Sequence, residues 1–271
     1  MTIDKLLIDQ YLPDLKKCVE EANDAVMEIY KSGNFDKSDK KDGSPLTIAD
    51  KRSNEIIINN LKLLTPNLKI ISEETFEPSL LKSIDSTYWL VDPLDGTKEF
   101  INKTDEFTVN IALIHNRKPI FGIVGAPVSK KVWHGSIFNT VSIENTKNTK
   151  LRVVMSKSHK SQEDKLFLEF LDRNKIEYSL VNKGSSLKLC CLCDDAADIY
   201  PRFGPTSEWD IAAAHAVLLS KGGSIIGIPD FNELSYSKTD TILNSSFIGF
   251  KNEATKNEFL PLLRDFFKKL V

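Results

Sequence analysis

The feature that most constrains the fold of this chain is a change of pattern near residue 150. Before it, apolar runs follow one another closely and are joined by short turns such as Asn116-Arg117-Lys118, which favours antiparallel strands. These strands are expected at residues 68–72, 88–91, 107–115, 119–127 and 131–138. After it, strands and helices alternate. The pattern predicts an α/β (α+β) chain, with an antiparallel-rich sheet in residues 1–150 and a smaller mixed sheet in residues 151–271.

Helical periodicity marks the first part of the chain. Residues 13–31 place their apolar side chains on one face and are followed by Gly33, and residues 46–64 form a second such stripe. The polar stretch 139–150 is expected to be a linker or a long hairpin tip. Beyond it, alternating strands and helices are expected at residues 152–156, 162–173, 176–181, 186–193, 197–200 and 211–220. A phenylalanine-rich tail predicts a closing amphipathic helix.

The charge balance narrows the class of protein. The 271 residues carry 36 Lys and Arg against 38 Asp and Glu, a formal net charge of −2, whereas a protein that coats a nucleic-acid polymer usually has a basic excess. No apolar run approaches the roughly 18 residues that cross a bilayer, and the first 13 residues lack the basic start of a signal peptide. Three of the four cysteines fall within residues 190–193, a poor layout for disulfides. A reduced, cytosolic protein with no nucleic-acid polymer as partner is expected.

One apolar strand carries most of the chemical information. It ends in Asp92 and Asp95, with Pro93 between them and Gly96 after them. Because proline cannot donate a hydrogen bond to a strand ladder, we expect the strand to stop at Pro93. The two carboxylates would then turn toward one point, and oxygen ligands of this kind suit Mg²⁺. Gly96 and Thr97 would add backbone N–H groups for an anion at a helix start; the alternative is an Asp-Gly turn with a helix cap.

Acidic residues at three other places extend this pattern. Glu73 and Glu74 follow another apolar run, Asp210 opens an apolar helix, and Asp50 lies in the sequence Thr47-Ile-Ala-Asp50. Taken singly, Asp210 is expected to be a helix cap and Asp50 part of a capping box. Together with the pair above, these residues would supply enough carboxylates to hold two or three Mg²⁺ ions around one phosphate.

Three segments, in chain order, are similar to the signature segments of the inositol monophosphatase-like, lithium-sensitive phosphatase superfamily. They are Ser72-Glu73-Glu74, Asp92-Pro-Leu-Asp95-Gly-Thr97 and Trp209-Asp210-x-Ala-Ala. Within that superfamily, the chain most resembles the bacterial 3′(2′),5′-bisphosphate nucleotidases of the CysQ type, on residues 93–100, 107–113, 184–188 and 200–206. The resemblance covers nearly the whole chain and implies a layered αβαβα sandwich of the sugar-phosphatase type.

The resemblance also implies roles for individual residues. The implied metal ligands are Glu73, Asp92, the carbonyl of Leu94, Asp95 and Asp210. Asp50 and Thr97 resemble the pair that orients the attacking water, with Glu73 taking part. The residues that resemble substrate-binding groups are Gly96, Thr97, Ser156, His159, Ser185, Lys188, Arg202 and Asp210.

These substrate-binding positions fall into two groups. Ser156 and His159 belong to a segment that resembles the one touching the base and sugar of a nucleotide. Ser185, Lys188 and Arg202 resemble the groups that hold a second, non-reacting phosphate. Because a substrate with two phosphates needs cationic partners beyond the metals, a lysine and an arginine are suitable residues there.

The function implied by the resemblance is Mg²⁺-dependent removal of the 3′-phosphate from adenosine 3′,5′-bisphosphate, which gives AMP and phosphate. The sulfated form, 3′-phosphoadenylyl sulfate, is implied as a second substrate, together with a role in sulfur metabolism and inhibition by lithium. A cytoplasmic place is implied; a peripheral position at the inner membrane is left open, as is the oligomeric state. Two alternatives remain: the same chemistry on an inositol or sugar phosphate, and a non-catalytic metal- or nucleotide-binding protein.

The cysteines and one histidine invite other chemistry. Cys190, Cys191 and Cys193 lack a second Cys or His pair at zinc-ligand spacing, so a buried helix is expected there rather than a metal or redox site. His215 lies on the apolar helix after Asp210 and is expected to be packed in the interior rather than catalytic.

Overall fold

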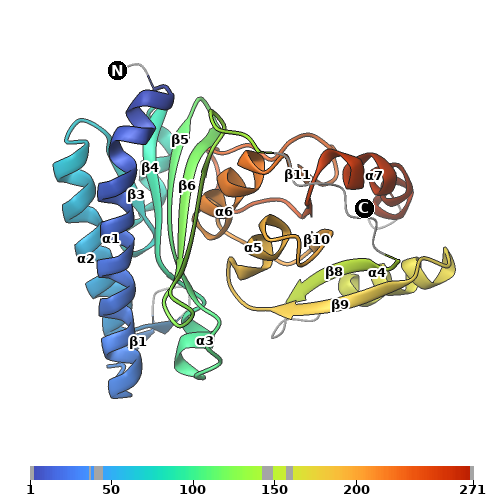
Figure 1. Cartoon of the computed structure of the whole chain (residues 1–271), viewed down its shortest axis with the longest axis horizontal. Coiled ribbons are helices and arrows are strands. Elements are labelled where there is room, and N and C mark those ends of the chain that lie inside the picture. The colour runs from blue at the N-terminus through green and yellow to red at the C-terminus, as the bar shows by residue number, and fades with distance from the viewer. Residues whose placement is uncertain (1–2, 37, 40–44, 142–148, 157–160, 269–271) are drawn as a thin grey trace.

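The computed structural model describes residues 3–36, 38–39, 45–141, 149–156 and 161–268. Its helices and sheets alternate in layers, which confirms the αβαβα sandwich (Figure 1). The helices of the outer and middle layers are α1 (Lys5–Ser32) with α2 (Ile48–Leu64), α5 (Leu187–Cys193) with α6 (Glu208–Ser220), and α4 (Gln162–Arg173) with α7 (Glu253–Phe267). In the part of the chain that the structure describes, no helix combines the length and apolar character that crossing a bilayer requires.

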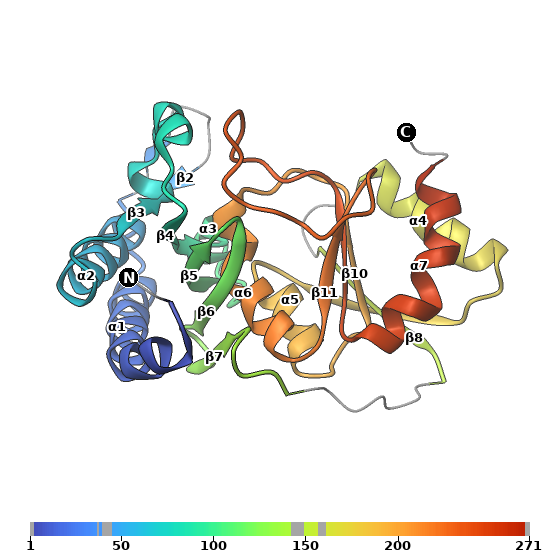
Figure 2. The same ribbon diagram turned by 90° about the horizontal axis from the view of Figure 1, so that it is seen from above.

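The first sheet has five strands in the order β3-β4-β5-β6-β7. Their bounds are β3 (Lys69–Ser72), β4 (Thr87–Asp95), β5 (Thr108–His115), β6 (Lys118–Ala126) and β7 (Lys131–Ser136). β3 runs parallel to β4, and the other neighbours are antiparallel, as the short turns predict. α1 and α2 cover one face of this sheet and α6 covers the other (Figure 2).

β4 does not stop at Pro93, which corrects the sequence prediction. The strand continues to Asp95, and its pairing register with β5 shifts between Asp92 and Asp95. Asp92 faces Asn110 in the ladder, and Asp95 faces Thr108. The irregularity accommodates the proline without ending the strand, because a residue within a bulge needs no ladder hydrogen bond.

α1 begins earlier than its periodicity predicts. It starts at Lys5 rather than at residue 13, because Asp4 caps it by accepting a hydrogen bond from the Leu7 N–H at 3.0 Å. Pro13 is accommodated inside the helix. The predicted end is confirmed, since Gly33 follows the last turn in a left-handed conformation with φ of 72°.

α2 begins at Ile48 rather than at residue 46, because Thr47 is its N-cap. The predicted capping box between Thr47 and Asp50 is confirmed, with the Asp50 carboxylate 2.7 Å from the Thr47 backbone nitrogen. The remaining short elements of this half are β1 (Ser38–Asp39), β2 (Pro45–Leu46), the 3₁₀ turns η1 (Glu73–Thr75) and η2 (Pro78–Ser83), and α3 (Thr97–Ile101).

The second sheet is mixed, as predicted, and also has five strands, in the order β11-β12-β10-β8-β9. Their bounds are β8 (Leu151–Ser156), β9 (Tyr178–Lys183), β10 (Ile199–Arg202), β11 (Ser224–Gly227) and β12 (Phe247–Phe250). β8 is parallel to β9 and β10, whereas β12 is antiparallel to β10 and β11. The division of the chain into units 1–150 and 151–271 stays a prediction, although the strands of the two sheets fall on either side of it.

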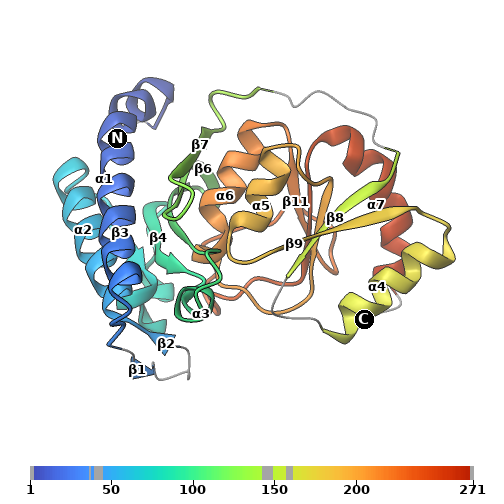
Figure 3. The same ribbon diagram turned by 60° about the horizontal axis from the view of Figure 1, so that its bottom comes forward.

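α6 is buried on nearly all sides because it lies between the two sheets, beside α5 (Figure 3). Its four alanines, at positions 212, 213, 214 and 216, are almost inaccessible. Small residues also stand opposite it: a Cβ built on Gly122 would overlap the backbone carbonyl of Ala213, and one built on Gly135 would overlap the Ser220 hydroxyl. The backbone of α6 therefore packs almost directly against the backbones of β6 and β7.

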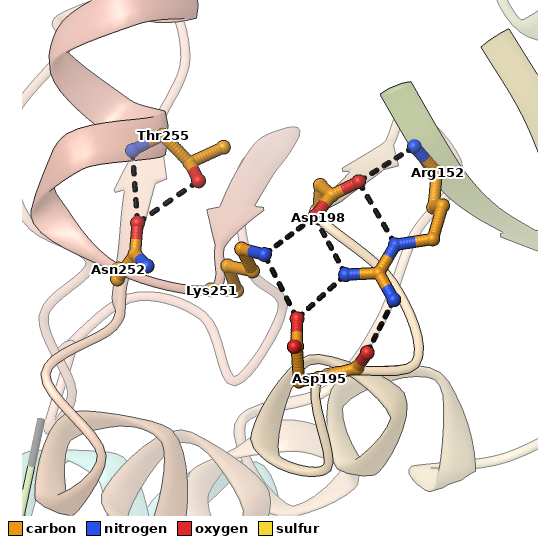
Figure 4. A network of polar contacts seen from close by, with 6 residues as sticks. All are labelled: Arg152, Asp195, Asp198, Lys251, Asn252 and Thr255. Carbon is orange, nitrogen blue, oxygen red and sulfur yellow. Dashed lines mark hydrogen bonds and ion pairs between the residues drawn. The ribbon is translucent and has the colours of Figure 1, made fainter. Parts of the chain in front are cut away.

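A partly buried ion network stabilises the second sheet (Figure 4). Arg152 of β8 pairs with Asp195 at 2.6 Å and with Asp198 at 2.8 Å. Lys251, after β12, reaches the same two carboxylates at 2.8 Å each, with a side chain only 2% exposed. Burial opposes the ionisation of Asp198, but the hydrogen bonds from Arg152 and Lys251 outweigh it and hold the pKa of Asp198 below its ordinary value.

Candidate active site

The turn that joins β4 to α3 is shaped by its own side chains. One carboxylate oxygen of Asp92 accepts the Leu94 N–H at 3.0 Å, and the Pro93 carbonyl accepts the Ser53 hydroxyl of α2 at 2.7 Å. Gly96 has φ of 91°, and a Cβ there would lie 3.2 Å from the Cβ of Ser185. The position therefore requires glycine both for its backbone conformation and for the close approach of the opposite wall.

The two carboxylate oxygens of Asp50 contact two different neighbours. Oδ2 completes the capping box of α2, and Oδ1 lies 3.1 Å from the hydroxyl of Thr97. Thr97 Oγ1 also lies 3.2 Å from the Leu94 carbonyl, so its single proton is given to one of these two acceptors at a time. The structural and the functional interpretations of Asp50 are therefore compatible, because each concerns a different oxygen.

Carboxylates from three separate elements act on one another at this turn. Burial raises the pKa of Asp92 well above its ordinary value, the negative charges of Glu73, Asp95 and Asp210 raise it further, and so does a hydrogen bond with Glu73. Burial also raises the pKa of Asp210, and Asp95 and Glu73 add to that effect. The ends of β4 and β3 and the start of α6 thus converge, as the sequence predicts from the apolar runs before them.

The opposite wall comes from residues 184–188, before and within the first turn of α5. The Ser185 hydroxyl donates to Asp95 Oδ2 at 2.8 Å, and the Ser186 N–H donates to the same oxygen at 2.6 Å. Lys188 donates from Nζ to the Ser185 carbonyl at 2.7 Å. Burial raises the pKa of Asp95, against the opposing effects of the Lys188 charge and of these two serines. Burial in turn lowers the pKa of Lys188.

A pocket of about 120 Å³ opens between these walls. Its lining includes seven of the predicted residues, namely Asp95, Gly96, Ser156, Ser185, Lys188, Arg202 and Asp210. The other predicted residues, Asp50, Glu73, Asp92, Leu94 and Thr97, do not line it and belong to the turn, strand and helix ends beside it. His159 lies outside the described residues. The pocket is therefore acidic at Asp95, Glu99 and Asp210 and basic at Lys188 and Arg202.

The guanidinium of Arg202 is held by one hydrogen bond, but one of its buried N–H groups lacks an acceptor among the described residues. Its Nη2 donates to the Pro205 carbonyl at 3.0 Å, whereas its Nε is buried and has no hydrogen-bond partner among the described residues. A buried guanidinium N–H without an acceptor is costly. An anion in the pocket would supply that acceptor, because Arg202 and Lys188 both line it.

The donor set fits a hard divalent cation. Among the described residues, no three acidic, histidine or cysteine side chains stand close enough together to hold an ion as they are. One oxygen of each of Asp92, Asp95 and Asp210 is held by a nearby N–H or hydroxyl group instead. Carboxylates that raise one another's pKa would nevertheless be stabilised by a cation, and oxygen ligands suit Mg²⁺. That these residues share ions stays a prediction.

Sequence reasoning did not assign a role to two polar residues of β5, Thr108 and Asn110. Thr108 and Asn110 lie on β5 and are almost inaccessible, and each contacts a serine of the opposite wall: Thr108 meets Ser185 at 2.6 Å, and Asn110 donates to Ser186 at 3.0 Å. The signal that could have found them is an amide and a hydroxyl within a strand that is otherwise strongly apolar.

The cysteines and His215 lie where the sequence predicts. Cys190 and Cys193 are buried in α5, Cys191 is partly buried, and all are free thiols. Burial raises the pKa of Cys190 well above its ordinary value, so it lacks the thiolate character that redox or metal chemistry needs. His215 is buried in α6, with Nδ1 2.9 Å from the Tyr236 hydroxyl.

Known proteins share both this sequence and this architecture. The 3′(2′),5′-bisphosphate nucleotidases CysQ of Salmonella typhimurium and Escherichia coli K12 are 37% and 38% identical to the chain, over 87% of it and 98% of each relative. The crystal structure of CysQ from Bacteroides thetaiotaomicron superposes with a TM-score of 0.76 at 32% identity, over 87% of this chain and 95% of that one. An inositol monophosphatase from Thermotoga maritima has the same fold at 20% identity, with a TM-score of 0.75 over 97% of this chain and 100% of that one.

The match extends well beyond the signature segments around the pocket. The model of the inositol monophosphatase family covers residues 10–264, from the first helix through the two sheets into α7. Both walls of the pocket, with their acidic and basic residues, lie within this range. Sequence, fold and family model therefore agree that the chain belongs to the inositol monophosphatase family.

Proposed function

We propose that this protein is a Mg²⁺-dependent 3′(2′),5′-bisphosphate nucleotidase, which hydrolyses the 3′-phosphate of adenosine 3′,5′-bisphosphate to AMP and phosphate. The names of the relatives at 37% and 38% identity support the reaction class. We further propose, from the family resemblance of the sequence, that 3′-phosphoadenylyl sulfate is a second substrate, that lithium inhibits the enzyme, and that the reaction serves sulfur metabolism in the cytoplasm.

One observation carries the choice of substrate: beside the acidic Asp95, Glu99 and Asp210, the pocket is lined by two basic residues, Lys188 and Arg202, here called the basic wall. Metal ions on Asp95 and Asp210 would meet the phosphate that reacts. Lys188 and Arg202 would be left to meet a second phosphate, and the partnerless Nε of Arg202 is a donor for it. An inositol monophosphate carries no second phosphate for this basic wall, so the bisphosphate is favoured over that alternative.

The size of the pocket agrees with recognition by phosphate groups. Its volume of about 120 Å³ is well below the roughly 300–1,000 Å³ of pockets that enclose a whole small molecule. We infer that the pocket encloses phosphate and that the nucleoside extends from it past Ser156, which lines the pocket at the end of β8.

The metal ligands in this proposal are Glu73, Asp92, the Leu94 carbonyl, Asp95 and Asp210. When bound, Mg²⁺ supplies Lewis-acid chemistry, which lowers the pKa of a coordinated water and neutralises phosphate charge. Thr97 orients the attacking water: with its own proton directed to Asp50 Oδ1, the Thr97 oxygen keeps lone pairs that accept a hydrogen bond from that water. Asp50 is itself fixed by the cap of α2 and so holds Thr97 in place.

A panel of phosphate esters tests the reaction. Phosphate release from adenosine 3′,5′-bisphosphate, 3′-AMP and inositol 1-phosphate is measured with and without Mg²⁺. We expect Mg²⁺-dependent release with a clear preference for the bisphosphate. A preference for the inositol ester would overturn the substrate, and no release from any ester would support a non-catalytic binding protein.

The role of the basic wall is tested by Arg202→Gln. The variant should lose most of the preference for the bisphosphate over 3′-AMP, because 3′-AMP lacks the phosphate that Arg202 would contact. Arg264→Gln, at an exposed position on α7, is the matched control and should keep the wild-type preference. An equal loss on both substrates in Arg202→Gln would show that Arg202 does not recognise a second phosphate.

A further inference from the structure

Ser186 joins three elements of the site. Its backbone N–H donates to Asp95 at the end of β4, at 2.6 Å, and its hydroxyl contacts the backbone carbonyl of Asp210 in the first turn of α6. The same hydroxyl lies 3.0 Å from the side-chain amide of Asn110 on β5. Two carboxylate-bearing segments are therefore linked through one serine, and that serine is linked to the first sheet.

The direction of each hydrogen bond follows from the chemistry of the groups. The Asp210 carbonyl and the Asp95 carboxylate can only accept, so the single hydroxyl proton of Ser186 goes to one of these two acceptors. The Ser186 oxygen must then accept from Asn110, which places the amide nitrogen of Asn110 toward Ser186. This orientation leaves the amide oxygen of Asn110 buried and without a hydrogen-bond partner among the described residues.

The amide of Asn110 is buried on the face of β5 that packs against α5 and α6. On its own face of β5, Asn110 lies between Thr108, which contacts Ser185, and Ala112, which packs in the core around α6, and Asn110 itself is 1% exposed. A buried amide oxygen without a partner costs stability, which an apolar residue would avoid. Asn110 also stands directly opposite Asp92 in the β4–β5 ladder. The contact with Ser186 is thus the feature that distinguishes the amide from an apolar side chain at this point.

We propose that Asn110 is a positioning residue for the metal-binding carboxylates: acting through the Ser186 hydroxyl, it holds the end of β4 and the first turn of α6 in one arrangement. This inference rests on the proposed function. Asn110 touches neither carboxylate group in this scheme and orients them through Ser186. Removing a group that orients metal ligands typically costs about 10–100-fold in metal affinity or activity.

Asn110→Ala tests the inference, with Asn23→Ala as the matched control. Asn23 lies on α1, is also buried, and also has an amide oxygen without a partner among the described residues. We expect Asn110→Ala to weaken Mg²⁺ binding about 10–100-fold, measured by the rise of the unfolding midpoint in a Mg²⁺ titration without substrate. The kcat should fall, with KM for the bisphosphate unchanged. Asn23→Ala should change the midpoint alone and leave Mg²⁺ affinity and kcat at wild-type values.

A double-mutant cycle of Asn110→Ala and Ser186→Ala tests whether Asn110 acts through the Ser186 hydroxyl. Ser186→Ala keeps the backbone N–H to Asp95 but removes the hydroxyl, so it should weaken Mg²⁺ binding as Asn110→Ala does. The double variant should bind Mg²⁺ no more weakly than the worse single variant, because both changes break the same link. Ser186→Thr, which keeps a hydroxyl, should restore most of the affinity. If Asn110→Ala does not fold, the two Ser186 variants decide the question alone.

The outcomes separate this inference from the proposed function. A wild type that releases phosphate with Mg²⁺, together with Asn110→Ala and Ser186→Ala of unchanged Mg²⁺ affinity and kcat, would overturn the inference alone. Additive losses in the double variant would also overturn it. A wild type that neither binds Mg²⁺ nor releases phosphate from any ester would overturn the proposed function, and the inference with it.

Discussion

His215 offers a quantitative test of how the middle layer is packed. The residue is 3% exposed in α6, and burial lowers its pKa to about 3, because a charged imidazolium would lose its hydration there. In the unfolded chain its pKa is the ordinary 6.5. The folded pKa thus lies below the unfolded one, so the unfolded state takes up the proton first as the pH falls. His215 therefore lowers the free energy of unfolding from about pH 6.5 down to about pH 3.

The size of this effect follows from the two pKa values. Between them, one proton is taken up on unfolding, which changes the free energy of unfolding by about 1.4 kcal/mol per pH unit. From pH 7 to pH 5, the contribution of His215 amounts to about 2 kcal/mol lost. Replacing His215 by glutamine removes the titration, so the variant should lose about 2 kcal/mol less than the wild type over the same range.

The assay is urea unfolding at pH 7, 6 and 5 for both proteins. Taking the difference between them at each pH cancels the carboxylates that titrate in the same range. Tyr236→Phe is the control, because it removes the hydrogen bond to His215 but leaves the buried imidazole. It should lose stability at every pH and keep the wild-type slope.

The reasoning is refuted if His215→Gln and the wild type lose stability in parallel between pH 7 and pH 5. Parallel curves would mean that His215 takes up a proton in the folded state as readily as in the unfolded chain. Water would then reach the helix between the two sheets, and the close packing of the middle layer described above would be wrong.

Three further substitutions test other parts of the structure. Asp92→Asn should abolish phosphate release yet raise the unfolding midpoint of the Mg²⁺-free protein, because the amide removes a buried carboxylate that its neighbours repel; a lower midpoint would contradict this. Gly122→Ala should lower the free energy of unfolding, measured in urea, by about 1–3 kcal/mol, since the new Cβ would overlap the Ala213 carbonyl. An unchanged midpoint would show that α6 can move away at little cost in stability. Lys251→Met should lower the free energy of unfolding by about 3–5 kcal/mol, because it removes one of the cations that pair with the buried Asp198. Wild-type stability in this variant would mean that Arg152 alone compensates the charge of Asp198.

The acidic residues of the candidate site could be singled out in the sequence because their signal is local. Asp92 and Asp95 end an apolar strand, and Asp210 opens an apolar helix. Each change from apolar to acidic marks the end of an element, where side chains reach the surface of a layer. By contrast, the contact between Asn110 and Ser186 joins positions 76 residues apart, so it depends on how the two sheets are placed rather than on either segment.

Short elements and helix starts were the parts of the fold that periodicity did not reach. β11 and β12, with four residues each, were not predicted, whereas β3 and β10 of the same length were. The start of α1 depends on a single cap, Asp4, and on a proline that the helix tolerates. In the first sheet, β4, β5 and β6 were predictable because they are long and apolar.

The position of α6 has a consequence for how the chain is made. All five strands of the first sheet leave the ribosome before residues 208–220, which cover one of its faces. Until that helix emerges, the nascent sheet presents an apolar surface to the cell. A chain cut short before residue 208 should therefore aggregate or remain bound to chaperones, whatever the intrinsic strength of its strand pairing.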